Sequence, residues 1–237
     1  MSAVPAALEP KEGAAQLPIP GLASAQSLRK LDCEYTACYC EENVFKLLQK
    51  LSSSTADGDP GELYAVFLSN RERQVEIWCQ QIGRPPHGHV MWDYHVILLQ
   101  CKTSAGRRSC NVWDLDSTLP FPAALSLYHN CALRPPKYSE RLYRVVPSAE
   151  MLRNFASDRS HMLDARGVFM QAPPNYPPLV SASQQTMTLP KFLDFSAGPE
   201  LLARMTAVAS GDSKAAPFGV VLREADFLAF FSEPHSR

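Results

Sequence analysis

The sequence lacks an apolar run of the roughly 20 residues that cross a bilayer, so no membrane-spanning helix is expected. Its N-terminus has neither the basic start nor the apolar stretch of a signal peptide, and no Asn-x-Ser/Thr glycosylation site occurs. It also lacks an excess of positive charge, since 23 lysines and arginines face 24 aspartates and glutamates. We therefore expect a cytoplasmic or nuclear protein that binds neither membranes nor nucleic acid.

The seven cysteines include no C-x2-C pair. An odd number without a regular spacing is typical of free thiols in a reducing compartment rather than of disulfides. Two groups come nearest to a metal-binding pattern, Cys33 with Cys38 and Cys40, and His87 with His89. Because neither has the spacing of a structural zinc site, the sequence predicts no zinc site.

The length of 237 residues favours one domain with a tail. Residues 1–28 contain no aromatic side chain and only three charged ones, which is too little bulky apolar surface to offset the entropy of ordering. We predict a disordered N-terminal arm over 1–28 and a single domain over 29–237. The proline-rich stretch 173–178 is expected to be an ordered surface loop.

Apolar spacing predicts a helix followed mainly by strands. Val44, Leu47, Leu48 and Leu51 lie on one face of a helix that begins close to Cys40 and ends near Ser52. Strand-like runs occupy 63–68, 75–79, 92–99, 110–115, 141–146 and 218–222. The connections are too short for crossover helices, so we expect an α+β fold in which an antiparallel sheet has helices packed on one side.

Cys40 stands where the predicted helix starts. A helix N-terminus offers unpaired main-chain N–H groups and a partial positive charge, and both favour a thiolate over a thiol. This position suits a nucleophile, although a free cysteine is more often a small buried apolar residue.

His95 and Asp114 lie in neighbouring predicted strands. A hairpin centred on Ser104-Ala105 sets the two residues directly opposite each other, which lets the carboxylate accept the Nδ1 proton of the imidazole. If the turn slips to Ala105-Gly106, Asp116 faces His95 instead. A histidine satisfied in the core and an aspartate capping a strand end are the structural alternatives. The order Cys, His, Asp on a helix start and successive strands is that of papain-like thiol hydrolases and favours a triad.

Four blocks resemble the protein N-terminal glutamine amidohydrolase family. They are Cys38–Asn43, Trp92–Val96, Asp114–Asp116 with Leu119–Pro122, and Asn154–Met162. The resemblance runs from about Cys33 to near Phe231. The sequence departs from the family in the arm, in the alanine-rich stretch 201–216 and in Phe45, where tryptophan is expected.

The resemblance implies a hydrolase that converts an N-terminal glutamine of a protein or peptide to glutamate, releases ammonia and feeds the N-degron pathway. It implies Cys40 as nucleophile, His95 as base and Asp114 as the acid that orients it, with Asp116 structural. The fold implied is papain/transglutaminase-like, with residues 29–237 as one catalytic amidohydrolase domain. We expect a monomer that needs no cofactor.

Five further residues are candidates for substrate binding. Tyr39 and Asn43 are candidate oxyanion donors beside the main-chain N–H of Cys40. Glu41, Asp93 and Asp158 are candidate acids for the α-amino group of the substrate. His161 is either a second base or, more in keeping with its Asp-Arg-Ser-His context, a residue that fixes a loop.

Three other functions remain as alternatives. A papain-like protease and a transglutaminase use the same kind of triad, and products distinguish them: a cleaved chain, a glutamine joined to an amine, or an acid in place of an amide. The third is a non-catalytic module that binds protein N-termini. Because a binding module needs none of Cys40, His95 and Asp114, the presence of all three argues against it.

Overall fold

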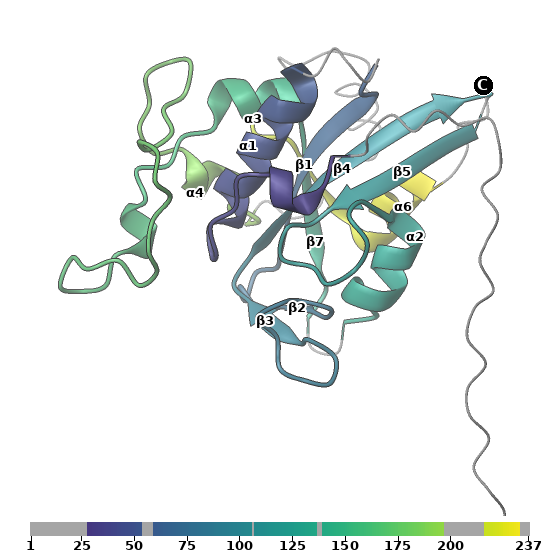
Figure 1. Ribbon diagram of the computed structural model, residues 1–237, viewed down its shortest axis with the longest axis horizontal. Helices are drawn as coiled ribbons and strands as arrows, with labels where there is room; N and C mark the ends of the chain where they lie inside the picture. The colour runs from purple at the N-terminus through teal and green to yellow at the C-terminus, as the bar shows by residue number, and fades with distance from the viewer. Residues whose placement is uncertain (1–27, 54–58, 106, 137–138, 197–215, 233–237) are drawn as a thin grey trace, which may run out of the picture.

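A computed structural model describes residues 28–53, 59–105, 107–136, 139–196 and 216–232 (Figure 1). Its centre is a six-stranded antiparallel sheet in the order β6-β5-β4-β1-β7-β8. The strands are β1 (Glu62–Ser69), β4 (His95–Ser104), β5 (Arg107–Trp113), β6 (Ala123–Ala124), β7 (Leu142–Pro147) and β8 (Val220–Arg223). The α+β class and the antiparallel sheet are thereby confirmed.

Helices cover both faces of this sheet, so the expectation of helices on one side is wrong (Figure 1). One face packs against α1 (Cys40–Ser53), α3 (Ser148–Asn154) and α4 (Leu189–Phe192). The other packs against α2 (Leu125–Tyr128), the π-helix η2 (His129–Leu133) and α6 (Glu224–Ser232). The cause lies in the central strands, because β1 is buried at every position from Leu63 to Ser69 and therefore needs cover on both sides.

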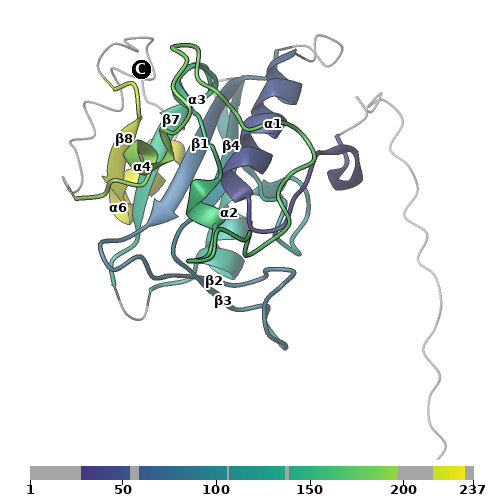
Figure 2. The ribbon, with the colours of Figure 1, turned by 90° about the vertical axis from the view of Figure 1, so that its left-hand side faces the viewer.

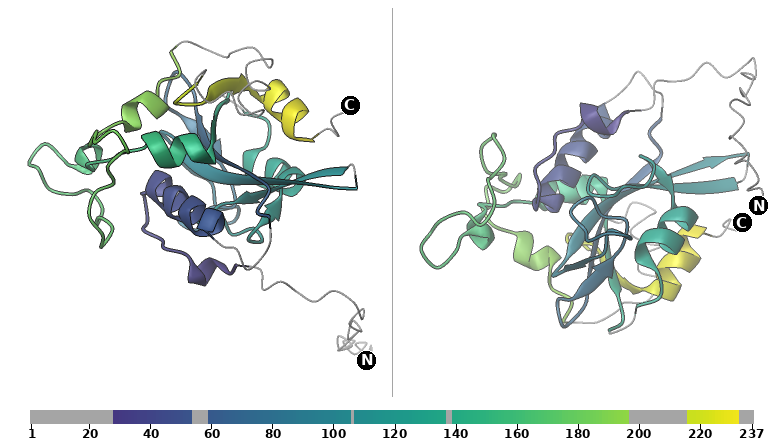
Figure 3. Two further views of the ribbon diagram at one scale, coloured as in Figure 1. Left: turned by 90° about the horizontal axis from the view of Figure 1, so that it is seen from above. Right: turned by 60° about the horizontal axis from the view of Figure 1, so that its bottom comes forward.

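A two-stranded sheet of β2 (Val75–Ile77) and β3 (Val90–Trp92) lies at one end of the main sheet, which the right-hand view of Figure 3 brings forward. The long connection from α3 to α4 contains η3 (Ser160–Met162) and passes across α1 (Figure 2). Residues 173–178 form an irregular loop within it, as predicted. No helix among the described residues is long and apolar enough to cross a membrane.

Most of the predicted arm lies outside the described residues. Its last residue, Leu28, is partly buried and packs against the cluster beneath α1. The 3₁₀ helix η1 (Lys30–Asp32) follows directly. The alanine-rich stretch is likewise outside the described residues, except for Ala216.

The β4–β5 hairpin has a different register from the one that sets His95 opposite Asp114. Ser104 pairs with Arg107, and the ladder runs to the pair Leu98 and Trp113. The turn is thus one residue later than the one centred on Ser104-Ala105, and Ala105 has φ 49°. Neither aspartate is in the ladder, because β5 ends at Trp113.

The register also brings two cysteines together. Cys101 and Cys110 are directly opposed, with Cα atoms 4.2 Å apart, and form a disulfide. The expectation of free thiols is therefore wrong for this pair, since cross-strand neighbours at this spacing fall within bonding reach. The free cysteines among the described residues are Cys33, Cys38, Cys40, Cys79 and Cys131.

Candidate functional site

Cys40 is the first residue of α1, as the sequence predicts. The helix start is fixed by Asn43, whose side-chain amide accepts the N–H of Thr36 at 2.8 Å and donates to its carbonyl at 2.8 Å. The Cys40 side chain is buried and receives a hydrogen bond from the main-chain N–H of Val96 on β4. β5 pairs with β4 only as far as Leu98, so His95 and Val96 have a neighbouring strand on the β1 side alone.

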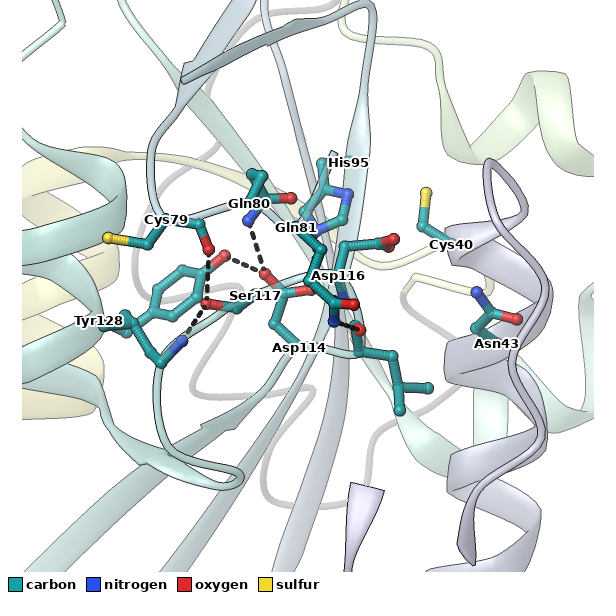
Figure 4. A network of polar contacts seen from close by, with 12 residues as sticks. Cys40, Asn43, Cys79, Gln80, Gln81, His95, Asp114, Asp116, Ser117 and Tyr128 are labelled. Atoms are coloured by element: carbon teal, nitrogen blue, oxygen red, sulfur yellow. Dashed lines mark hydrogen bonds and ion pairs between the residues drawn. The ribbon is translucent and has the colours of Figure 1, made fainter. Parts of the chain in front are cut away.

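His95, the first residue of β4, lies between Cys40 and Asp114 with one ring nitrogen toward each (Figure 4). Its Nε2 is 3.1 Å from Oδ1 of Asp114. The expected use of Nδ1 for this bond is therefore wrong, and the structure uses the other nitrogen. Because a carboxylate only accepts, Nε2 carries the proton in neutral His95 and Nδ1 keeps a lone pair. Nδ1 is buried and has no hydrogen-bond partner.

Two residues that the sequence did not suggest complete the surroundings of Asp114 (Figure 4). Tyr128 Oη donates to Oδ2 at 2.8 Å, and Gln80 Nε2 donates to the same oxygen at 3.1 Å. The main-chain N–H of Asp116 donates to Oδ1 at 2.9 Å. Both contributing side chains come from segments distant in sequence, so no local pattern marks them.

Burial and charge act in opposite directions on the pair. Burial raises the pKa of Asp114, but the charge of His95 and the hydrogen bonds from His95, Tyr128 and Gln80 outweigh it and bring the pKa to about 2. Burial lowers the pKa of His95, but the charge of Asp114 and its hydrogen bond outweigh it, so the pKa is raised. The arrangement thus keeps Asp114 ionised and makes His95 a stronger base than a free imidazole.

The Cys40 thiol is in the opposite situation. Burial raises its pKa well above the usual value, the carboxylates of Glu41 and Asp116 add to this, and the Val96 N–H opposes it. A helix N-terminus therefore does not suffice to ionise this thiol, and a base has to take its proton. The lone pair of His95 Nδ1 meets that need.

Several buried polar atoms without a hydrogen-bond partner gather beside Cys40. Oε1 of Glu41 and both ring nitrogens of His161 are among them, and Glu41 Oε1 lies 3.4 Å from His161 Nε2. The other Glu41 oxygen, Oε2, accepts from Tyr94 Oη at 3.1 Å and lies 3.6 Å from Cys40 Sγ. Buried polar groups normally have hydrogen-bond partners. We therefore expect a ligand that donates hydrogen bonds to bind at this cluster.

The other candidate residues are already engaged. Asp93 is exposed and pairs with Arg73 at 2.8 Å, and Asp158 is exposed and accepts the N–H of Ser160 at 2.9 Å. Tyr39 is fully buried, and its hydroxyl donates to the carbonyl of Gln171 at 3.1 Å. Tyr39 therefore connects the start of α1 to the long α3–α4 connection.

A buried ion pair makes the same connection more firmly. Arg159 donates from Nε and Nη2 to the two oxygens of Glu42, each at 2.9 Å, and from Nη1 to the carbonyl of Tyr176 at 2.9 Å. Glu42 is fully buried and Arg159 nearly so. The pair fixes the α3–α4 connection against the helix that carries Cys40.

Replacing Glu42 by glutamine is expected to lower the free energy of unfolding by about 3–5 kcal/mol, because it leaves the buried Arg159 charge uncompensated. For a chain of this size the melting temperature falls by about 6–20 °C, measured by thermal denaturation. The control is Arg166→Gln, since the Arg166 side chain is 83% exposed in its pair with Asp164. Its change should stay within about 0.5 kcal/mol. Equal melting temperatures for Glu42→Gln and the wild type would contradict this role.

The metal-ligand groups considered from the sequence do not gather in the described part of the chain. Instead, His95, Asp114 and Asp116 each place one ligand atom within 4.8 Å of the others. The donor set argues for hydrogen bonding, because Asp114 already accepts from four groups and Asp116 Oδ1 accepts from Tyr35 Oη at 2.7 Å. We assign no metal to this cluster.

Comparisons with known proteins point to one family. The model of the N-terminal glutamine amidase family matches residues 35–231. Protein N-terminal glutamine amidohydrolase from Oryza sativa subsp. indica is 39% identical over 203 residues, covering 84% of this chain and 87% of the relative. The protein of that name from Drosophila grimshawi is 40% identical over 173 residues, covering 70% of this chain and 81% of the relative.

Proposed function

The chain belongs to the N-terminal glutamine amidase family, and on that premise we propose that it hydrolyses the side-chain amide of an N-terminal glutamine to glutamate and ammonia. One structural observation supports this most: the His95–Asp114 pair leaves a buried, unpartnered ring nitrogen on the side of Cys40 (Figure 4). A thiol and a base in this arrangement suit acyl transfer.

In the proposed reaction, His95 Nδ1 takes the proton of Cys40 as the sulfur attacks the carboxamide carbon. The imidazolium returns this proton to the amide nitrogen, the C–N bond breaks and ammonia leaves a thioester on Cys40. Water, deprotonated by His95, then attacks the thioester carbon, and the C–S bond breaks to give the glutamate carboxylate and the thiol. Asp114 holds the ring and stabilises the imidazolium.

We further assign a papain/transglutaminase-like arrangement to the fold, with the nucleophile at a helix N-terminus and the base and acid on strands or directly after them. The positions of Cys40 at the start of α1, His95 at the start of β4 and Asp114 after β5 support this assignment. The same arrangement also suits a papain-like protease or a transglutaminase. The mass of a glutamine peptide after reaction distinguishes the three activities, and an unchanged mass would favour the non-catalytic module.

Glu41 is our choice for the acid that binds the substrate's α-amino group. It is fully buried, lies next to Cys40 in the sequence and has one oxygen without a hydrogen-bond partner. An ammonium group donates up to three hydrogen bonds and brings a positive charge to this oxygen, which otherwise has the His161 ring 3.4 Å away. Asp93 and Asp158 lie at the surface with partners of their own and are the weaker candidates.

Acetylation of the α-amino group is expected to lower kcat/KM by about thirty- to several-thousand-fold, which corresponds to about 2–5 kcal/mol for a buried charge left unpaired. The measurement compares a glutamine peptide with its acetylated form in the wild type and in Glu41→Gln. The variant should lose activity on the free peptide and little on the acetylated one, so the ratio between the two collapses. Asp158→Asn is the control and should keep the full ratio. If the ratio of kcat/KM between the free and the acetylated peptide were unchanged in Glu41→Gln, another group would have to bind the α-amino group.

A further inference from the structure

The proposed reaction needs a donor for the oxygen of the reacting carboxamide, and the side chains expected to supply it are engaged elsewhere. The Asn43 amide is bound at both ends to the main chain of Thr36, and the Tyr39 hydroxyl donates to Gln171. Gln80 and Gln81 donate to Asp114 and to the carbonyl of Leu115. Each of these groups already has a hydrogen-bond partner in the described structure.

Trp92 has the donor that these residues lack. It is the last residue of β3, and its indole stacks on the His95 ring with centroids 5.4 Å apart and planes 18° from parallel. Its Nε1 is buried and has no hydrogen-bond partner. An indole N–H left unpaired in a protein interior is costly, so a residue that keeps one next to the catalytic base requires an explanation.

We propose that the indole N–H of Trp92 donates a hydrogen bond to the carboxamide oxygen of the substrate glutamine, together with the main-chain N–H of Cys40. The proposal rests on the function proposed above. The Trp92 ring lies against the ring of His95, and the main-chain N–H of Cys40 belongs to the residue that carries the attacking sulfur. When the sulfur attacks, the carbonyl oxygen becomes an oxyanion, and donors already in place stabilise that charge more than they stabilise the ground state.

The chemistry of the indole also orients the substrate. A carboxamide has an oxygen that accepts and an NH₂ that donates, and the two ends are nearly the same size. An indole only donates, so it binds the oxygen and leaves the NH₂ for another group. His95 Nδ1 then faces the nitrogen, which is the atom that has to receive a proton before ammonia departs. Trp92 thereby selects the productive orientation of the amide.

The test is Trp92→Phe, which keeps an aromatic ring against His95 and removes only the N–H. We expect kcat on a glutamine-terminated peptide to fall by about 10²–10³-fold, the usual effect of losing one such donor. KM and the melting temperature should change little. The rate at which iodoacetamide alkylates Cys40 should match the wild type, because that reaction needs the thiolate and no oxyanion. Trp78→Phe is the control, since Trp78 contacts a different histidine, His89, with the two rings tilted by 44°, and should keep the wild-type kcat.

Two results would overturn the proposal. A kcat of Trp92→Phe within threefold of the wild type would show that the N–H has no part in the reaction. A parallel fall of kcat and of the Cys40 alkylation rate would show that the indole acts through His95 and not on the substrate. An inactive wild type with a normally alkylated Cys40 would overturn the proposed function itself, and the role of Trp92 with it.

Discussion

Replacing Cys40 by alanine is expected to reduce ammonia release from a glutamine-terminated peptide by about 10⁴-fold or more, because no other group in the site can form the thioester. Ammonia release and the mass of the product peptide measure the loss. The melting temperature should remain near that of the wild type, since the side chain loses one sulfur atom. Loss of activity through unfolding would appear as a lower melting temperature.

Cys38→Ala is the matched control for this experiment. Cys38 is two residues away and only partly buried, and it belongs to the turn before α1 rather than to the helix. It should retain most of the activity, and its φ of 67° adds no new strain in the variant, because cysteine and alanine both have a Cβ. Comparable activities of Cys40→Ala and the wild type would rule out Cys40 as the nucleophile.

Asp114→Asn is expected to lower kcat by about 10⁴-fold, as loss of the orienting acid does in related triads. The physical reason is the set of four donors around this carboxylate. An asparagine has one accepting oxygen, so its NH₂ has to face either His95 and the Asp116 N–H or Gln80 and Tyr128. Neutral asparagine also no longer stabilises imidazolium. Circular dichroism and a melting curve check that the variant is folded.

Asp116→Asn separates this role from the general effect of an acid near the site. The Oδ1 of Asp116 accepts from Tyr35 Oη, and an asparagine oxygen accepts equally well. We expect the variant to act mainly on stability and to keep kcat within about tenfold of the wild type. If Asp116→Asn were the inactive variant and Asp114→Asn the active one, the assignment of the orienting acid would be reversed.

Much of the fold follows from local patterns. The start of α1 and the predicted strand positions are confirmed because each rests on an apolar run that the structure buries. The prediction of a single strand over 92–99 is wrong, because this segment belongs to two strands. Trp92 ends β3 and His95 begins β4. The hydrophobic pattern does not show that the chain changes sheet within this strand-like run.

The hairpin register shows why the spacing argument failed. Moving the turn by one residue moves each pairing by two, so Leu99 faces Val112 instead of Cys110 while every side chain stays on the same face. Hydrophobic alternation shows on which face of the sheet a side chain lies, but it does not distinguish pairings that differ by two residues. The resemblance to a family selected Asp114, and the structure explains how it contacts His95: the chain leaves the sheet after Trp113.

The residues around Asp114 could not be predicted, for a different reason. Tyr128 and Gln80 reach Asp114 from segments that are 14 and 34 residues away in the sequence. Each looks like an ordinary core or turn residue in the sequence. Only contacts between distant segments reveal them, and one sequence carries no signal for such contacts.

The buried pair of Arg159 and Glu42 has a consequence for protein engineering. Substrate preference beyond the first residue is most easily altered by grafting, in which a segment near the site is exchanged for that of a relative, and the α3–α4 connection is the natural segment to choose. Its Arg159 is neutralised by a carboxylate on α1, more than a hundred positions earlier in the chain. A graft that omits this arginine leaves Glu42 buried and unpaired near the start of α1, two residues after Cys40. Residues 42 and 159 therefore have to be exchanged together in any such graft.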